Sequence, residues 1–127
     1  MGDDDSTSAL SGYTVTLDGL SYGNYNFTYN VDAIGSCDDV DVTVQIIIHP
    51  QPNSGTPSPA LFCENDLVSN SPIDLYDHLT GNDVGGIWSD DSTTGLLTGS
   101  DVDITGLAVG SYNFTYTITN GFGCTNS

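Results

Sequence analysis

An internal repeat is the feature that most limits the possible folds of this chain. Residues 3–37 align without a gap onto residues 90–124, at a spacing of 87 residues, and 15 of the 35 aligned positions are identical. A period of this length matches one small β-sandwich domain and is too long for a solenoid unit. We therefore expect parts of two copies of one domain.

The local pattern within the repeat is that of β-strands. Tyr25, Phe27, Tyr29 and Val31 are separated by single Asn or Thr residues, and residues 112–118 repeat the pattern. An apolar period of two predicts strands with one apolar face, and no segment has a helical period. The sequence predicts an all-β sandwich with almost no helix. Strands are expected near residues 13–18, 24–32, 39–48, 60–63, 72–76, 85–89, 101–105 and 111–119.

A proline-rich segment separates the two copies. Residues 50–59 contain four prolines, which predicts a semi-rigid linker over residues 50–57. The strand-like residues 38–48 have no counterpart after Cys124. We therefore expect residues 1–49 to be the C-terminal half of one repeat, and residues 58–127 to be the next repeat without its last strand.

Four motifs resemble a known family. They are Leu61–Asp66, Gly85–Asp91, Leu107–Tyr116 and Gly123-Cys124. They are similar to motifs of the immunoglobulin-like tandem repeats of very long cell-surface and secreted proteins in Bacteroidetes, of the gliding-motility-associated, adhesin type. The resemblance implies immunoglobulin-like sandwiches, an extracellular or bacterial cell-surface location and an adhesin stalk role. It implies no catalytic residues.

Structural roles follow for three aromatic residues. Tyr25 and Tyr112 each follow a Leu-x-x-Gly-x pattern, which is typical of the tyrosine corner of immunoglobulin-type sandwiches. In such a corner the phenol donates a hydrogen bond to the chain just upstream. Trp88 is the candidate for the central core tryptophan.

The comparison with immunoglobulin-type sandwiches also gives an interpretation of the three cysteines. Phe114 stands where an antibody domain has its core cysteine, so the usual disulfide between the sheets is not expected. We predict instead a disulfide between Cys63 and Cys124, with Cys37 unpaired in this chain. Such a bond implies an oxidising compartment.

The charge of the chain excludes several classes of function. The chain has no Lys or Arg and 17 acidic residues, for a net charge of −17. Binding to nucleic acids or to anionic membranes needs basic side chains, and enzymes acting on nucleotides need cations that hold phosphate. We expect no nucleic-acid partner, and no membrane insertion either, since apolar runs such as Ile46–Ile48 are far shorter than the roughly 20 residues that span a bilayer. The partners predicted by charge are cations.

Calcium is the one cofactor that the acidic residues suggest. The candidate ligands are Asp90, Asp91, Asp101 and Asp103, because Ca²⁺ prefers carboxylate and carbonyl oxygens. Other acidic groups are Asp38, Asp39 and Asp41, or Glu64 and Asp66. The alternative interpretation is a solvated acidic surface that keeps the protein soluble. His49 and His78 have no second ligand at metal spacing, so zinc is not expected.

The sequence offers candidates both for sugar binding and for glycosylation. Tyr22 and Tyr76 are candidates for a sugar-binding face, with packing as the alternative. Ser6 and Ser92 lie in Asp-Ser-Thr sequences that resemble the O-glycosylation sequon of Bacteroidetes. Asn26 and Asn113 fit the N-glycosylation pattern but lie in predicted strands, where outward polar residues are the alternative.

Two functions remain compatible with the sequence. The first is a non-catalytic structural repeat of an extracellular adhesin stalk or filament, in which chains assemble head to tail. A sandwich without its last strand exposes an edge, which predicts strand exchange between copies and a strand-swapped homopolymer. The alternative is an immunoglobulin-like module that binds a carbohydrate or another surface.

Overall fold

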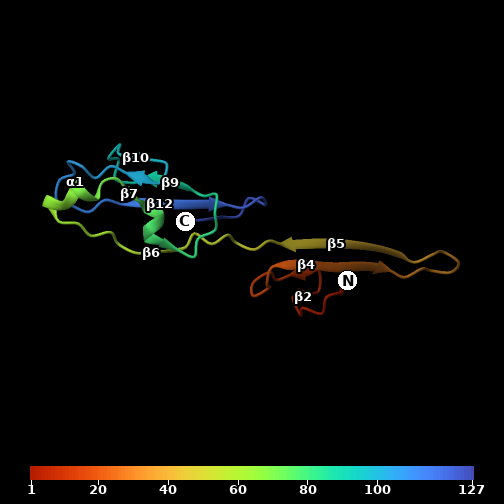
Figure 1. Cartoon of the computed structure of the whole chain (residues 1–127). Coiled ribbons are helices and arrows are strands. Elements are labelled where there is room, and N and C mark those ends of the chain that lie inside the picture. The colour runs from red at the N-terminus through yellow and green to blue at the C-terminus, as the bar shows by residue number, and fades with distance from the viewer. The chain divides into compact units, whose positions relative to one another are not determined.

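The chain folds into two compact, all-β units. The computed structural model describes residues 1–127 and divides them into unit 1, Met1–Pro50, and unit 2, Gln51–Ser127. Figure 1 shows strands linked by loops in both units and one short α-helix, α1, which covers Leu67–Asn70. No helix has the length and apolar character needed to cross a membrane. The predicted all-β fold is confirmed.

Unit 1 is built around one three-stranded antiparallel sheet. A long hairpin forms most of it, because nine consecutive residues of one strand pair with nine of the next. The sheet has the order β1-β4-β5, with β1 at Gly2–Asp3, β4 at Gly23–Val31 and β5 at Val40–Ile48. A second hairpin joins β2, Leu10–Ser11, to β3, Thr14–Val15. Phe27 of β4 is the one fully buried side chain of this unit.

Unit 2 contains two three-stranded antiparallel sheets. The first has the order β10-β11-β7, with β10 at Leu97–Thr98, β11 at Asp101–Val102 and β7 at Ile73–Asp74. The second has the order β13-β12-β9, with β13 at Thr125–Asn126, β12 at Phe114–Thr119 and β9 at Ile87–Asp90. The remaining elements are β6 at Thr56–Pro57, β8 at Leu79–Thr80, and the 3-10 turns η1 at Glu64–Asp66 and η2 at Leu75–His78.

The two sheets of unit 2 share one core. Val102 and Ile104 are buried with Leu75, and Trp88 and Phe114 from the other sheet pack against them. Leu79, Tyr116 and Ile118 form a second buried cluster, which also contacts Trp88. The strand pairs β7–β11 and β9–β12 are those of strands B–E and C–F in an immunoglobulin sandwich.

The sequence repeat is also a structural repeat. Asp3 pairs with Phe27 in unit 1, and 87 residues later Asp90 pairs with Phe114 in unit 2. The short hairpins also match, since Leu10 faces Val15 and Leu97 faces Val102. We call residues 3–31 and their counterparts 90–118 the shared segment, because both copies have the same backbone pairing.

A turn within the shared segment depends on glycine. The Leu20 N–H donates to the Leu17 carbonyl at 3.2 Å, and the Leu107 N–H donates to the Ile104 carbonyl at the same distance. Gly19 and Gly106, which lie inside these turns, both have a φ of +83°. Residues with a side chain rarely adopt this conformation, so glycine is required in both copies.

Three details of the secondary-structure prediction are corrected. Residues 51–57 are part of unit 2 rather than a free linker, because Pro52 is buried and Thr56–Pro57 pairs with β8. Residues 60–63 form no strand. The segment 101–105 keeps its strand only at Asp101–Val102, and a turn closed by the bond from the Leu107 N–H to the Ile104 carbonyl follows two residues later. Proline and the tight turns explain these differences, since both interrupt strand pairing.

Candidate binding groove

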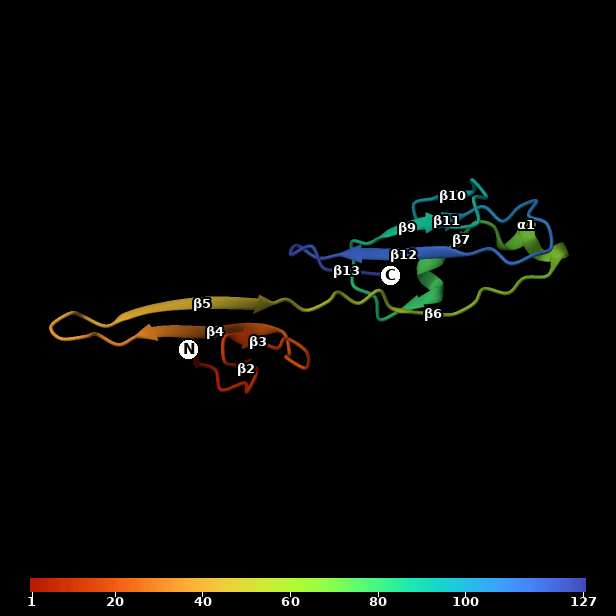
Figure 2. The same ribbon diagram turned by 180° about the vertical axis from the view of Figure 1, so that it is seen from behind.

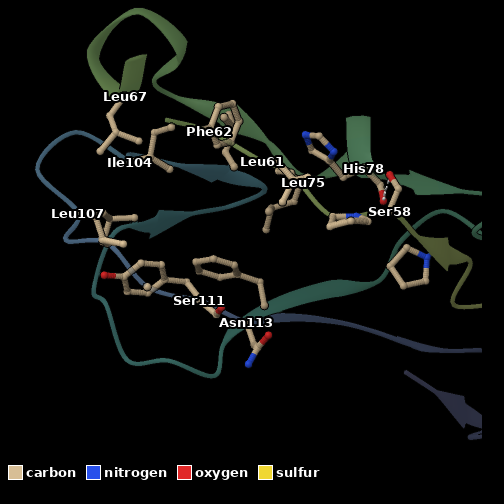
Figure 3. Close-up of a pocket in the computed structure, with 18 of the residues that line it drawn as sticks. Ser58, Leu61, Phe62, Leu67, Leu75, His78, Ile104, Leu107, Ser111 and Asn113 are labelled. Carbon is tan, nitrogen blue, oxygen red and sulfur yellow. Dashed lines mark hydrogen bonds between the residues drawn. The ribbon is translucent and has the colours of Figure 1, made fainter. Parts of the chain in front are cut away.

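Unit 2 contains a groove of about 580 Å³. One wall is the run 57–62, which begins at the last residue of β6, and the other is the run 107–114, which ends in the first residue of β12. Figure 3 shows Leu61 and Phe62 on one side and Ser111 and Asn113 on the other. Leu75 and Trp88 of the core also line the groove. We call this feature the groove.

Hydrogen bonds hold the two walls in place. The Ser58 N–H donates to the His78 carbonyl at 2.8 Å, which ties the first wall to η2. In the second wall the Tyr112 hydroxyl donates to the Ala108 carbonyl at 2.9 Å. Between these anchored walls the lining is mostly apolar, so the groove suits an apolar occupant more than a charged one.

The Tyr112 bond is one of a matched pair. In unit 1 the Tyr25 hydroxyl donates to the Ser21 carbonyl at 2.8 Å, again to a residue four positions upstream. Both bonds have the geometry that the tyrosine-corner pattern predicts. The corner fixes the chain that leads into β4 and β12, and in unit 2 that chain is the wall of the groove.

Trp88 lies between the groove and an aromatic cluster. Its ring centroid is 5.7 Å from that of Tyr76 and 5.2 Å from that of Tyr116, which agrees with the predicted role in the core. The indole Nε1 is buried and has no hydrogen-bond partner. Burial is the main cause that raises the pKa of Tyr76, and the neighbouring Tyr116 adds to this effect.

The calcium candidates are not brought together. The chain contains no group of three or more His, Cys, Asp or Glu side chains that could hold a metal ion. Instead, Asp90, Asp91 and Asp103 bind nearby protein donors, and Asp101 is an exposed residue of β11. The predicted four-residue cluster is therefore wrong, because each carboxylate serves its own turn or strand.

The hydrogen bonds of Asp90 illustrate the structural role of these carboxylates. Its carboxylate accepts from the Thr94 hydroxyl at 2.8 Å and from the Gly95 N–H at 2.9 Å. Burial raises the pKa of Asp90, but these hydrogen bonds outweigh burial and lower the pKa below its ordinary value. Asp3 accepts from Thr7 at 2.8 Å in the same way, and this bond lowers its pKa.

Asp103 closes a different turn. Its carboxylate accepts from the Ser71 hydroxyl at 2.7 Å and from the Thr105 N–H at 2.9 Å. The Ser71 oxygen in turn accepts from the Ile104 N–H at 3.0 Å. The bond from Ser71 is the main cause that lowers the pKa of Asp103. This network connects the segment before β7 to the turn after β11.

The predicted disulfide does not form in this structure. Cys63 and Cys124 are free thiols, as is Cys37. Cys63 directly precedes η1 and α1, whereas Cys124 directly precedes β13. Figure 2 shows α1 and β13 at opposite ends of unit 2.

The sugar-related candidates do not form one site. Tyr22 is an exposed residue of unit 1, and Tyr76 lies in the aromatic cluster of unit 2. Ser6 is exposed, whereas Ser92 is half-buried and its hydroxyl oxygen accepts from the Asn113 N–H at 2.8 Å. His49 and His78 likewise belong to different units.

The groove itself was not predicted from the sequence. Its first wall falls in the proline-rich segment and the strand expected at residues 60–63, and its second wall contains the apolar run Leu107-Ala108-Val109. An exposed apolar run next to a tyrosine corner was the available signal. Searches of protein-family models, curated proteins and solved structures find no match to this chain.

Proposed function

We propose that the chain is a non-catalytic structural repeat of an extracellular stalk or filament. The observation that carries this proposal is the shared segment, which has the same pairing and the same turn bonds in both units. A scaffold that recurs with the same pairing and the same turn bonds fits a spacer, because a spacer needs the same shape in every copy. The resemblance to Bacteroidetes surface repeats supports the same location and role.

The distribution of charge supports an extended assembly. One full period, residues 38–124, contains 12 acidic residues and no basic residue. Tandem copies therefore repel one another at low ionic strength, and this repulsion favours a rod over a compact cluster. Such an array keeps its distal tip at a distance from the cell surface.

A series of lengthened chains tests the spacer role. The natural chain up to Cys124 is extended by one, two or three further copies of residues 38–124, and the maximum dimension is measured by small-angle X-ray scattering. A spacer predicts equal increments for each added copy. A dimension that stays nearly constant as copies are added would contradict the proposal.

The groove favours a second candidate, a module that binds a carbohydrate or another surface. Aromatic residues, including Phe62, Tyr112 and Trp88, line it and offer faces on which a sugar ring can stack. A glycan array separates the two candidates. The spacer role predicts no signal above that of the Trp88→Leu variant, whereas a lectin-like module predicts a signal that this variant loses.

A further inference from the structure

We infer that the groove is an acceptor for strand β5, Val40–Ile48, of a second copy of this chain. This inference deepens the proposed structural role and rests on it. In the complex, the incoming strand runs antiparallel to β12 and continues the sheet β13-β12-β9 on the side opposite β9. The donated strand leaves its own β4 to do so.

The register comes from the repeat. In unit 1, Gly23 faces Ile48, Tyr25 faces Ile46 and Phe27 faces Val44. The counterparts of Gly23–Phe27 at a spacing of 87 residues are Gly110–Phe114, and these five residues line the groove. The place that β5 occupies beside β4 in one unit is therefore an open groove in the other.

The edge of β12 is available for pairing. Phe114–Thr117 pair with β9 on one side, and β13 pairs only with Ile118 and Thr119 on the other. The backbone from Gly110 to Thr117 thus has no strand on the groove side. An edge with unused backbone donors and acceptors is the usual template for adding a strand.

Strand β5 is suited to be donated. Its even-numbered residues share the apolar face with Phe27, yet Val40, Val42 and Val44 remain 58%, 56% and 52% exposed. It is also the edge strand of its sheet. Since the β4–β5 hairpin buries little apolar surface, leaving β4 loses less than entry into a core lined by Leu75, Trp88 and Phe114 gains.

Charge selects the part of β5 that enters. Residues 42–48 carry no charge, whereas Asp38, Asp39 and Asp41 precede them. In a protein of net charge −17, an uncharged apolar segment can approach the groove and its Glu64 without adding like charges. The acidic end of the strand lies toward β13, outside the groove.

A peptide of residues 38–49 tests the acceptor directly on the intact chain. Trp88 is the one tryptophan of the protein and lines the groove, so its fluorescence reports entry of a peptide that has no tryptophan. We expect a saturable change in Trp88 emission. The same peptide with Val44→Asp and Ile46→Asp should show at least a tenfold weaker effect, while Thr43→Asp on the polar face should bind like the original.

Two chain variants locate the site. Leu61 lines the groove and is 85% exposed, so Leu61→Asp should weaken peptide binding about tenfold without unfolding the chain. Val84 is 91% exposed and does not line the groove, so Val84→Asp is the matched control and should bind normally. Equal binding by both variants, or equal binding of all three peptides, would overturn the inference.

A third chain fills the groove in cis. The chain up to Cys124, followed by a second copy of residues 38–50, should no longer bind the peptide and should melt at a higher temperature than the natural chain. Undiminished peptide binding would rule out the groove as the site. If peptide binding fails while the lengthened chains still form rods, strand donation is wrong and the spacer role stands.

Discussion

Tyr116 and Tyr29 occupy the same position in the two copies of the shared segment, but Tyr116 is 4% exposed and Tyr29 is 41% exposed. The difference arises from what covers them. In unit 2, Tyr116 shares a buried cluster with Leu79, and Trp88 packs against it, whereas the ring next to Tyr29 in unit 1 is that of Tyr13, which is itself 80% exposed. The same strand sequence thus has a covered face in one unit and an uncovered one in the other.

Removing the Tyr116 hydroxyl tests this difference. It donates to the Asp83 carbonyl at 2.7 Å and accepts from the Gly86 N–H at 2.8 Å. Tyr116→Phe leaves both groups unpaired, so we expect a loss of about 1–3 kcal/mol in the free energy of unfolding. The matched variant Tyr29→Phe should cost less than about 0.5 kcal/mol. Chemical denaturation followed by circular dichroism measures both, and equal losses would contradict the assignment.

Gly86 tests how closely the chain approaches Tyr116. A Cβ atom placed on Gly86 would lie 2.3 Å from the Tyr116 ring and 2.7 Å from the Thr117 carbonyl oxygen. We expect Gly86→Ala to destabilise unit 2 by about 1–3 kcal/mol through overpacking. Gly121 has open space around it, and Gly121→Ala should change stability by less than about 0.5 kcal/mol. The melting temperatures of the two variants test this prediction. An unchanged melting temperature for Gly86→Ala would show that the contact between Gly86 and Tyr116 is not tight.

The lowered pKa values of three aspartates predict a loss of stability at low pH. Hydrogen bonds lower the pKa of Asp3, Asp90 and Asp103 below the ordinary value of 3.8. A lowered pKa in the folded state contributes stability that is complete above 3.8 and is lost as the pH falls through the lower folded value. We therefore expect the melting temperature to drop below about pH 3.8. The difference in melting temperature between the natural chain and the Asp90→Asn variant should become smaller as the pH falls over the same range. A difference in melting temperature that stays constant down to pH 2 would show that the lowered pKa of Asp90 does not contribute to acid stability.

Salt should stabilise the protein without regard to ion type. At net charge −17 with no basic residue, added salt screens repulsion within the folded chain. Because no acidic cluster of metal-binding type exists, Ca²⁺ and Mg²⁺ at equal concentration should raise the melting temperature by equal amounts. A larger rise with micromolar Ca²⁺ than with Mg²⁺ would reveal a specific site.

The cysteines should behave as independent thiols. A thiol-reactive dye should modify Cys37 and Cys63 quickly and the half-buried Cys124 more slowly. A reducing agent should leave the melting temperature unchanged, since no disulfide contributes to stability. A mass two units below that of the reduced chain would instead show that a disulfide has formed.

The sequence predicted those parts of the structure that depend on local patterns. The alternation around Tyr25 and Tyr112 correctly predicted β4 and β12, and the Leu-x-x-Gly-x-Tyr pattern predicted both corner bonds. The hydrogen bonds of the Asp90 carboxylate were not predicted, because the sequence was equally compatible with a calcium ligand and with a solvated acidic side chain. The groove also escaped it, because its two walls are about 50 residues apart and meet only in the fold.

The shared segment has one further consequence. The Thr7–Asp3 and Thr94–Asp90 bonds are both 2.8 Å long, although unit 1 buries one hydrophobic side chain and unit 2 buries six. The geometry of these turns is therefore encoded within about 30 residues and does not wait for burial. In an array of such repeats, this segment therefore keeps the same local shape whether its apolar face is covered or exposed.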